Sequence, residues 1–424
     1  MAAGEKIFIA DKATLDKVYN LLAVEPVWGF IEHNAILSPT GGRIEYTGLN
    51  KNYKPLSLDK STGAMSLNDW ADHPIILGNK PYMVKSDGTP DYRLNENDYT
   101  KKEDGTASDV ANTSYDGGAF AWLPKIYKQE YMVGYDRHVN FSMTARDGYE
   151  PVGFIDPDNN ELEGVWLPMF YGSILNASTT PKMASLSGLQ PCYNNATAAE
   201  KTAISNFSAR AAFLGGPIVN TIIDLLILFA GTTNLQEAYG YGNRSGYDAS
   251  LEPTYGVKQN AVVGGGQFYG TSDGKSLNKV FHSLVLITQN QYMRDPYTLC
   301  VNGRIKVSRN YTYDLTGATY LDTGIDVEAP EENSWCYPHI YRTIPGFGHF
   351  PVPPYNGSTS LGGCDGLYRS ASQATFTAVA LRFGSCGDGS HGGPRALHLG
   401  SSATNANWSI GAAVLLLPPV GVAA

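Results

Sequence analysis

A cysteine and a histidine three residues apart, Cys336 and His339, have the residue types and spacing of half a zinc site. Zinc in a structural site needs four ligands, and His349 is the nearest residue that could add to this pair. Two or three scattered ligands do not define a site. We therefore predict a packed loop here and no bound metal.

A second motif imitates the opening of a calcium-binding EF-hand loop. Asp156, Asp158 and Asn160 alternate as the first oxygen ligands of such a loop do, but the glycine position holds Glu161 and the closing glutamate position holds Leu167. Without the glycine turn and the bidentate carboxylate, the loop cannot enclose a calcium ion. The sequence Asp-Pro-Asp-Asn-Asn instead predicts a hairpin turn.

The cysteines could carry thiol or disulfide chemistry. They are odd in number and widely spaced, with no C-x-x-C pair, which argues against a disulfide framework and a zinc ribbon. We predict free thiols, made in a reducing cytosol. The residues are Cys192, Cys300, Cys336, Cys364 and Cys386.

Length and charge limit the possible partners. A chain of 424 residues is long enough for more than one domain, and 42% hydrophobic against 17% charged residues predicts a chain folded throughout. The net charge is −9, and no cluster of lysine or arginine stands out. Nucleic acid and anionic membrane surfaces are therefore excluded as expected partners.

No segment has the pattern of a signal peptide or a membrane span. Charged residues interrupt residues 1–22, so we expect no signal peptide. The most apolar stretch, residues 217–230 (PIVNTIIDLLILFA), is shorter than the roughly 20 residues that span a bilayer and contains Asp224. With Pro217 in its first turn and Gly231 after its end, it predicts a buried helix and no membrane insertion.

The remaining elements predict an α+β fold with helices packed on an antiparallel sheet. Residues 1–30 suggest a short amphipathic helix followed by an extended stretch, residues 43–99 suggest β hairpins, and the polar residues 101–118 suggest a long loop or a domain boundary. Residues 119–127 and 130–135 are expected to pair as strands. A helix should begin at the capping box formed by Thr197 and Glu200 and end at Gly215-Gly216, and strands and long loops should return after residue 240.

Several blocks of the sequence together resemble one family. They include GRIEYTGLNKNYKPLSL (42–58), PYMVKSDGTPDYRLNENDYTKKEDG (81–105), AFAWLPKIY, GVWLPMFYGS and, most specifically, ALRFGSCGDGSHGGPRALHLGSSATNANWSIGAA (380–413). The family is that of the C-type-lectin-fold tail and receptor-binding proteins of phages and prophages. It includes the variable proteins of diversity-generating retroelements that are similar to major tropism determinants.

The resemblance implies a C-type-lectin-like (formylglycine-generating-enzyme-like) domain in residues 116–424. It places a mostly β attachment or assembly region in residues 1–115. The implied function is recognition of a host cell-surface protein or glycan by a virion protein, which also contacts phage tail or baseplate proteins. A homotrimer is usual for a tail-fibre tip, although the sequence has no trimerisation motif. No catalysis and no cofactor are implied.

Within the C-terminal segment, residues 381–411, we expect a division between scaffold and contact surface. Apolar residues such as Leu381, Leu397, Leu399, Trp408 and Ile410 would be core, as would residues 412–417. The small and polar residues between them would face solvent and bind the ligand. These predicted ligand-binding residues are Ser385, Cys386, Asp388, Ser390, His391, Arg395, His398, Ser401 and Ser402.

If a retroelement diversifies this segment through adenine-directed change of Asn-type codons, Lys, Glu, Gln, Met and Trp would be excluded from it. None of the five occurs in residues 381–403. The segment departs from the family at two positions. An aromatic residue is common where Cys386 stands, and glycine is common where Phe383 stands.

Two other functions are compatible with the same fold, since fold alone does not assign function. A formylglycine-generating type of enzyme needs a reactive cysteine pair near the C-terminus, and the late cysteines here, Cys364 and Cys386, lie outside that pattern. A bacterial surface ligand-binding protein is the other alternative. Calcium-dependent sugar binding is not expected, because Gln190-Pro191 is followed by Cys192 and Trp408 by Ser409.

Two further features concern the contact surface. Arg369 is more typical of a structural residue that bonds backbone carbonyls than of a ligand clamp. Tyr239, Tyr241 and Tyr247 either extend the recognition face or pack beneath a loop.

Overall fold

The computed structural model describes residues 27–59, 64–260, 270–271, 274–275, 281–286 and 289–424. These residues form a mixed α+β structure dominated by β-sheets, which confirms the predicted class. The short helix predicted within residues 1–30 lies outside the described residues, and the extended stretch expected after it agrees with the strand at residues 27–33. No helix in the described part of the chain is both long and apolar enough to cross a membrane.

The first sheet joins the start of the described chain to its middle. Its order is β2-β1-β10-β9, and every pairing is antiparallel. The strands are β1 (Val27–His33), β2 (Ile44–Gly48), β9 (Tyr127–Val133) and β10 (Asp136–Ser142).

A second sheet joins early, middle and final segments in the order β14-β27-β11-β8-β5-β6-β7. The β5–β6 hairpin lies within residues 43–99, where β hairpins were predicted, and it turns at residues 86–89, where Lys85 N–H donates to the Thr89 carbonyl. The last strand, β27, pairs with β11, and β11 separates it from β8. The strands are β5 (Pro81–Lys85), β6 (Pro90–Asn95), β7 (Asp98–Lys102), β8 (Gly117–Pro124), β11 (Gly164–Pro168), β14 (Ala211–Phe213) and β27 (Val414–Leu416).

These two sheets bear on two predictions. Residues 119–127 and 130–135 do not pair with each other: β8 pairs with β5 and β11, whereas β9 pairs with β10. That prediction is wrong because the alternation of apolar residues does not show which neighbour a strand takes.

A domain boundary near residue 115, as expected from the sequence, would divide the strands of both sheets. One hydrophobic core contains residues from Trp28 to Leu417, on both sides of that boundary.

A third sheet, built mostly from the last third of the chain, has the order β19-β18-β17-β24-β25-β23-β20, with β26 beside β17. Four separate hairpins complete the described strands: β3 (Ser57–Asp59) with β4 (Ala64–Ser66), β12 (Ser173–Leu175) with β13 (Lys182–Ala184), β15 (Gly270–Thr271) with β16 (Gly274–Lys275), and β21 (Ile340–Ile344) with β22 (Gly348–Val352). The strands of the third sheet are β17 (Tyr292–Val301), β18 (Arg304–Val307), β19 (Leu321–Asp326), β20 (Ser334–Cys336), β23 (Leu367–Arg369), β24 (Thr377–Arg382), β25 (Leu397–His398) and β26 (Ile410–Gly411).

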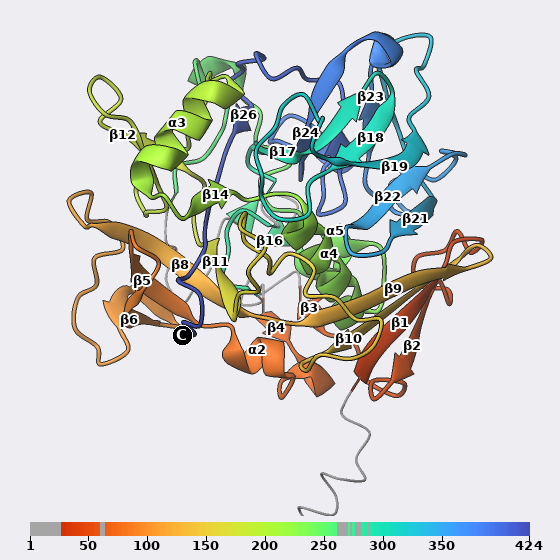
Figure 1. The fold of residues 1–424 in the computed structure, drawn as a ribbon, viewed down its shortest axis with the longest axis horizontal. Coiled ribbons are helices and arrows are strands. Elements are labelled where there is room, and N and C mark those ends of the chain that lie inside the picture. The colour runs from red at the N-terminus through yellow and green to blue at the C-terminus, as the bar shows by residue number, and fades with distance from the viewer. Residues whose placement is uncertain (1–26, 60–63, 261–269, 272–273, 276–280, 287–288) are drawn as a thin grey trace, which may run out of the picture.

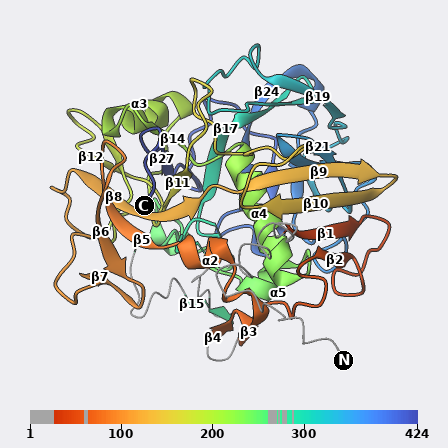
Figure 2. The same ribbon diagram turned by 60° about the horizontal axis from the view of Figure 1, so that its bottom comes forward.

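The predicted buried helix is α4 (Pro217–Ala230), and it lies in the middle of the molecule in both views (Figures 1 and 2). Proline occupies its first turn, and Gly231 ends it at a φ of +61°. All its side chains are buried, including Asp224, so a polar partner is needed in the core. The shorter α2 (Pro74–Gly78) and α5 (Leu235–Tyr239) lie near it, and α5 contacts it.

Helix α3 (Thr197–Phe207) begins where predicted, but it ends at Phe207 and not at Gly215-Gly216, since Ala211–Phe213 form β14, and the predicted capping box does not form. The N-cap residue is Ala196, and the hydroxyl of Thr197 donates to the carbonyl of Ala403, 2.9 Å away. Glu200 is buried and accepts from Nε of Arg294 at 2.5 Å. The side chains of Thr197 and Glu200 therefore bond to residues far away in the sequence and do not cap the helix.

Candidate functional site

Most of the scaffold predicted for the C-terminal segment is confirmed. Leu381, Leu397, Leu399 and Ile410 are buried, as are residues 412–417. They lie on or beside β24, β25, β26 and β27, so the strands of this segment are anchored in the core. The prediction for Trp408 is wrong, because its indole is only partly buried.

The predicted contact residues divide into two groups. Five are partly exposed, and for these ligand binding stays a prediction: Asp388, Ser390, His391, His398 and Ser402. For the other four the expectation that they face solvent is wrong, because the loops fold back on the core. The buried residues are Ser385, Cys386, Arg395 and Ser401.

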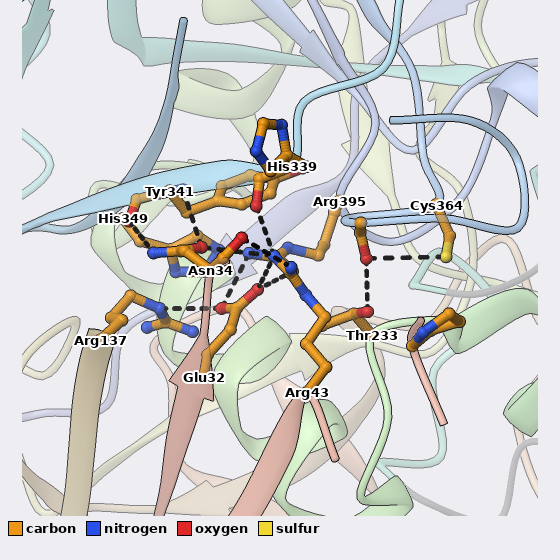
Figure 3. A network of polar contacts seen from close by, with 12 residues as sticks. Glu32, Asn34, Arg43, Arg137, Thr233, His339, Tyr341, His349, Cys364 and Arg395 are labelled. Carbon is orange, nitrogen blue, oxygen red and sulfur yellow. Dashed lines mark hydrogen bonds and ion pairs between the residues drawn. The ribbon is translucent and has the colours of Figure 1, made fainter. Parts of the chain in front are cut away.

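Arg395 is the clearest correction. Its guanidinium makes two hydrogen bonds to the carboxylate of Glu32 on β1, at 2.9 and 3.2 Å, and it lies 3.5 Å from the ring centre of Tyr341 (Figure 3). Both ends of the pair are fully buried. Arg395 therefore fixes the C-terminal segment to the first described strand and is not available to a ligand.

Glu32 is the centre of a larger buried network. It also accepts from Arg43 at 2.8 Å and from Arg137 at 3.1 Å. Burial alone would raise the pKa of Glu32, but the guanidinium groups of Arg395, Arg43 and Arg137 hold it well below its usual range. The carboxylate is therefore charged and structural.

The network continues to Asp224 of α4. It supplies the polar partners that this buried carboxylate requires. Asp224 accepts from Arg137 at 2.7 Å and from Lys128 at 3.2 Å, and His349 lies 3.2 Å away. His349 is thus part of the core. It does not extend Cys336 and His339 into a zinc site.

The loop that follows β24 is held by its own polar groups. The Asp388 carboxylate accepts from the backbone N–H and the hydroxyl of Ser385, at 2.6 and 2.7 Å. Burial raises the pKa of Asp388, although these hydrogen bonds act to lower it. Ser385 and Asp388 therefore shape the loop, and Gly387 at its tip is exposed.

His391 lies on the same loop inside an aromatic group. Its ring stacks on Trp335, with centroids 5.0 Å apart, and its Nδ1 is 2.6 Å from the hydroxyl of Tyr337. Burial lowers the pKa of His391. The imidazole is consequently a neutral, partly exposed member of an aromatic surface.

His398 is held more firmly. It stacks on Tyr368 with centroids 4.1 Å apart, and its Nδ1 accepts from the backbone N–H of Gly400 at 3.2 Å. Burial lowers its pKa to about 4. His398 is nevertheless partly exposed and so stays a candidate contact.

Three aromatic residues near Gly387 of the loop form a second group, which we call the aromatic cluster: Tyr247, Tyr255 and Trp408. The two tyrosine rings are parallel within 2°, with centroids 6.0 Å apart, and Trp408 is 5.7 Å from the first and 5.2 Å from the second. Tyr247 is 53% exposed. Its backbone N–H donates to the carbonyl of Cys386 at 3.1 Å, so the cluster is joined to the loop.

Sequence reasoning found only part of this surface. Tyr247 was noted with its neighbours, of which Tyr239 is buried in the core and donates to the carbonyl of Leu226. Tyr255 and Trp335 were missed, since single aromatic residues far from the segment carry no local signal. Their position depends on which loops the fold brings together.

The thiols do not have the environment of reactive cysteines. All five cysteines are free. Cys364 and Cys386 are buried, and burial raises the pKa of each to about 12. A thiol that stays protonated near neutral pH is a poor nucleophile.

The remaining sequence motifs have structural partners. The Asp156 carboxylate accepts from the backbone N–H groups of Asp158 and Asn160, at 2.9 and 2.8 Å, which confirms the hairpin turn. Arg369 donates to the carbonyl of Glu328 at 3.0 Å, as predicted for a structural arginine. Within the described residues no group of three or more His, Cys, Asp or Glu side chains could hold a metal ion.

Comparison with known proteins adds no assignment, because neither a protein-family model nor a curated protein matches the chain.

Proposed function

We propose that this protein is a receptor-binding protein of a phage tail, with a C-type-lectin-like fold. It would bind a ligand on the host cell surface through the partly exposed loops of the C-terminal segment. The observation that carries the proposal is the division of that segment. Most of its apolar residues and Arg395 are fixed in the core, while residues 387–391 reach the surface, with the partly exposed rings of Tyr247 and Trp408 near Gly387 and that of Trp335 stacked on His391.

Such an arrangement suits non-covalent recognition. Aromatic rings offer a large contact area with few rotatable bonds, and Tyr, Trp and Arg are the residue types that dominate binding hot spots. The rings of Tyr247 and Trp408 are held by each other and by the loop, so little entropy is lost when a ligand binds them.

The backbone at Phe383 supports the resemblance on which the proposal rests. Its φ is +73°, in the left-handed region that favours glycine. The family commonly has glycine at this place. Phe383 therefore differs from the family in its side chain, whereas its backbone has a conformation that glycine adopts readily.

Residues 1–115 would attach the protein to a tail or baseplate. Because β1 and β2 belong to one sheet with β9 and β10, and β5 to β7 to one sheet with β8, this attachment region would share both sheets with the binding region. A formylglycine-generating type of activity has less support, since Cys364 and Cys386 are buried, protonated thiols.

A cell-binding experiment tests the proposal. Wild type is compared with a variant carrying Tyr247→Ala, His391→Ala and Trp408→Ala, and with Tyr135→Ala as a matched control, because Tyr135 is 69% exposed on the β9–β10 hairpin. We expect the triple variant to bind host cells at least tenfold more weakly and the control to bind as wild type does. Undiminished binding by a folded triple variant would place the contact surface elsewhere.

The neighbouring DNA offers a second test. A nearby reverse transcriptase gene, with an imperfect template copy of the sequence that encodes the C-terminal segment, would support diversification. Intact, non-diverging copies beside a sulfatase gene would instead favour the enzyme.

A further inference from the structure

The surface loop of residues 387–391, which we call the recognition loop, is joined to helix α5 by a buried amide. Gln236 lies on α5 and is 4% exposed. Its Nε2 donates to the carbonyl of Gly392 and, at 3.4 Å, to that of Ser390. Because both acceptors are backbone groups, this contact does not depend on which side chains the loop carries.

Asp365 is the third acceptor of the Gln236 amide. Its carboxylate is buried: Oδ1 accepts from Nε2 of Gln236 at 3.1 Å, and Oδ2 accepts from the backbone N–H of Arg395 at 2.7 Å. On the other side of the amide, Oε1 of Gln236 accepts from the guanidinium of Arg244 at 2.8 Å. A guanidinium can only donate, so Oε1 faces Arg244 and Nε2 faces Asp365.

A proton on Asp365 would disrupt this arrangement. A carboxylate accepts at both oxygens, whereas the neutral acid carries one O–H donor. A proton on Oδ1 would face Nε2 of Gln236, and a proton on Oδ2 would face the N–H of Arg395. Turning the amide of Gln236 would place Nε2 against the donors of Arg244. The amide therefore holds the recognition loop best when Asp365 is ionised.

We propose that Asp365, acting through Gln236, is a positioning residue for the recognition loop, and that its ionisation switches the loop between a held and a released state. The consequence for host-cell binding rests on the proposed function, since only a loop that contacts the ligand would weaken binding when it is released. The hold on the loop is a property of the buried hydrogen bonds alone.

The switch should operate near neutral pH. Burial raises the pKa of Asp365 to about 7, although the hydrogen bonds from Gln236 and Arg395 and the charge of Arg395 act to lower it. The loop should therefore be released toward pH 6 and held toward pH 8. The same raised pKa makes this group lower the stability of the whole fold as the pH rises from 3.8 to about 7. A tighter loop at higher pH would consequently not be a by-product of a more stable fold.

Other titratable groups lie around Asp365 and on the loop. Around Asp365 they are Tyr337, Tyr341, Cys364 and Arg395. Burial raises the pKa of both phenols and of the thiol, and pairing with Glu32 raises that of Arg395, so none of these changes charge between pH 6 and pH 8.

On the recognition loop, burial lowers the pKa of His391 below 6.5 and raises that of Asp388. Both side chains remain in the Asp365→Asn variant. A comparison of this variant with wild type therefore separates their titration from that of Asp365.

Hydrogen exchange of the full chain, followed by mass spectrometry of peptides that cover residues 387–395, measures the hold on the loop directly. Wild type is compared with Asp365→Asn at pH 6, 7 and 8, after correction for the intrinsic pH dependence of exchange. We expect protection in wild type to rise about tenfold from pH 6 to pH 8, the effect of one hydrogen bond to a charged group. Asp365→Asn keeps the shape of the side chain but never ionises, so its protection should stay low at every pH.

Two further variants complete the test. Gln236→Leu removes the amide and should release the loop at every pH. Thr233→Val is the matched control, because it removes a buried hydroxyl that donates to the carbonyl of Gly362 at 2.6 Å and leaves Asp365 and Gln236 in place. This control should keep the pH profile of wild type. Thermal unfolding at each pH would confirm that the variants are folded.

Protection of the loop that does not change with pH in wild type, or that changes equally in Asp365→Asn, would overturn the proposal. If Asp365→Asn does not fold, Gln236→Leu decides, since a wild-type pH profile in that variant would overturn it as well.

Host-cell binding, measured on the same samples, separates this proposal from the proposed function. We expect wild type to bind about tenfold more weakly at pH 6 than at pH 8 and Asp365→Asn to bind weakly at both. Binding that ignores pH while the protection of the loop changes would contradict the proposed contact surface and leave the switch standing.

Discussion

Replacing Arg395 with alanine should destabilise the protein strongly, although sequence analysis placed this residue on a ligand surface. The substitution removes both hydrogen bonds to Glu32 and the contact with the ring of Tyr341. Breaking a buried ion pair by removing one partner typically costs about 3–5 kcal/mol. Glu32 would keep Arg43 and Arg137, so its carboxylate stays ionised but loses one of three partners.

Urea unfolding followed by tryptophan fluorescence measures the effect. Arg304→Ala is the control, since Arg304 is 37% exposed and pairs with Asp322 and Asp326 at the surface. An exposed pair contributes about 0–1 kcal/mol. We expect Arg395→Ala to lower the free energy of unfolding by about 3–5 kcal/mol. A loss no larger than that of the control would refute the structural role, and Arg395 would return to the set of candidate contacts.

Three further predictions concern the backbone and a buried acid. Because the φ of Phe383 is +73°, we expect the Phe383→Gly variant to be at least as stable as the Phe383→Ala variant in chemical denaturation. At an ordinary strand position, glycine is less stable than alanine by about 0.5–1 kcal/mol. A Phe383→Ala variant clearly more stable than Phe383→Gly would contradict this prediction. Gly231→Ala should lower the thermal stability more than Gly134→Ala does. Both glycines have a φ of +61°, but only at Gly231 would an added Cβ lie 2.9 Å from Tyr46 and 2.9 Å from Pro55. Equal losses of stability would show that the backbone conformation alone matters. Burial raises the pKa of Glu200 from 4.5 to about 7, so the folded state binds more protons than the unfolded state between these pH values, and this group lowers stability as pH rises through that window. Between pH 4.5 and pH 7, the free energy of unfolding of wild type, measured with urea, should fall by at most about 3 kcal/mol relative to that of the Glu200→Gln variant. A difference between the two proteins that does not change with pH would refute the raised pKa.

Local patterns predicted the elements whose signals lie within a few residues. The apolar run of residues 217–230, with proline at its start and glycine after its end, became α4 with the predicted bounds. The turn at Asp156 formed because its carboxylate bonds to backbone groups two and four residues away. In both cases the partners that fix the structure are close in the sequence.

Predictions failed where a side chain bonds to a residue far away in the sequence. Thr197 and Glu200 match a capping box, yet they bond to Ala403 and Arg294 instead. Arg395 looked like a solvent-facing residue, because nothing near it in the sequence indicates that Glu32 lies opposite. A polar residue between apolar ones can face either solvent or a buried partner, and one sequence does not distinguish the two.

That distinction matters for how a variable surface can coexist with a stable fold. The buried polar residues of the C-terminal segment, such as Arg395, Ser385 and Ser401, make hydrogen bonds to Glu32, Asp388 and Asn405, respectively, that a substitution would remove. Residues 387–391 have fewer such obligations, apart from the Asp388 carboxylate. If the segment is diversified, tolerated changes should therefore concentrate at Ser390, His391 and Ser402 and avoid Arg395, because the buried network joins the segment to β1 and must be preserved in every variant.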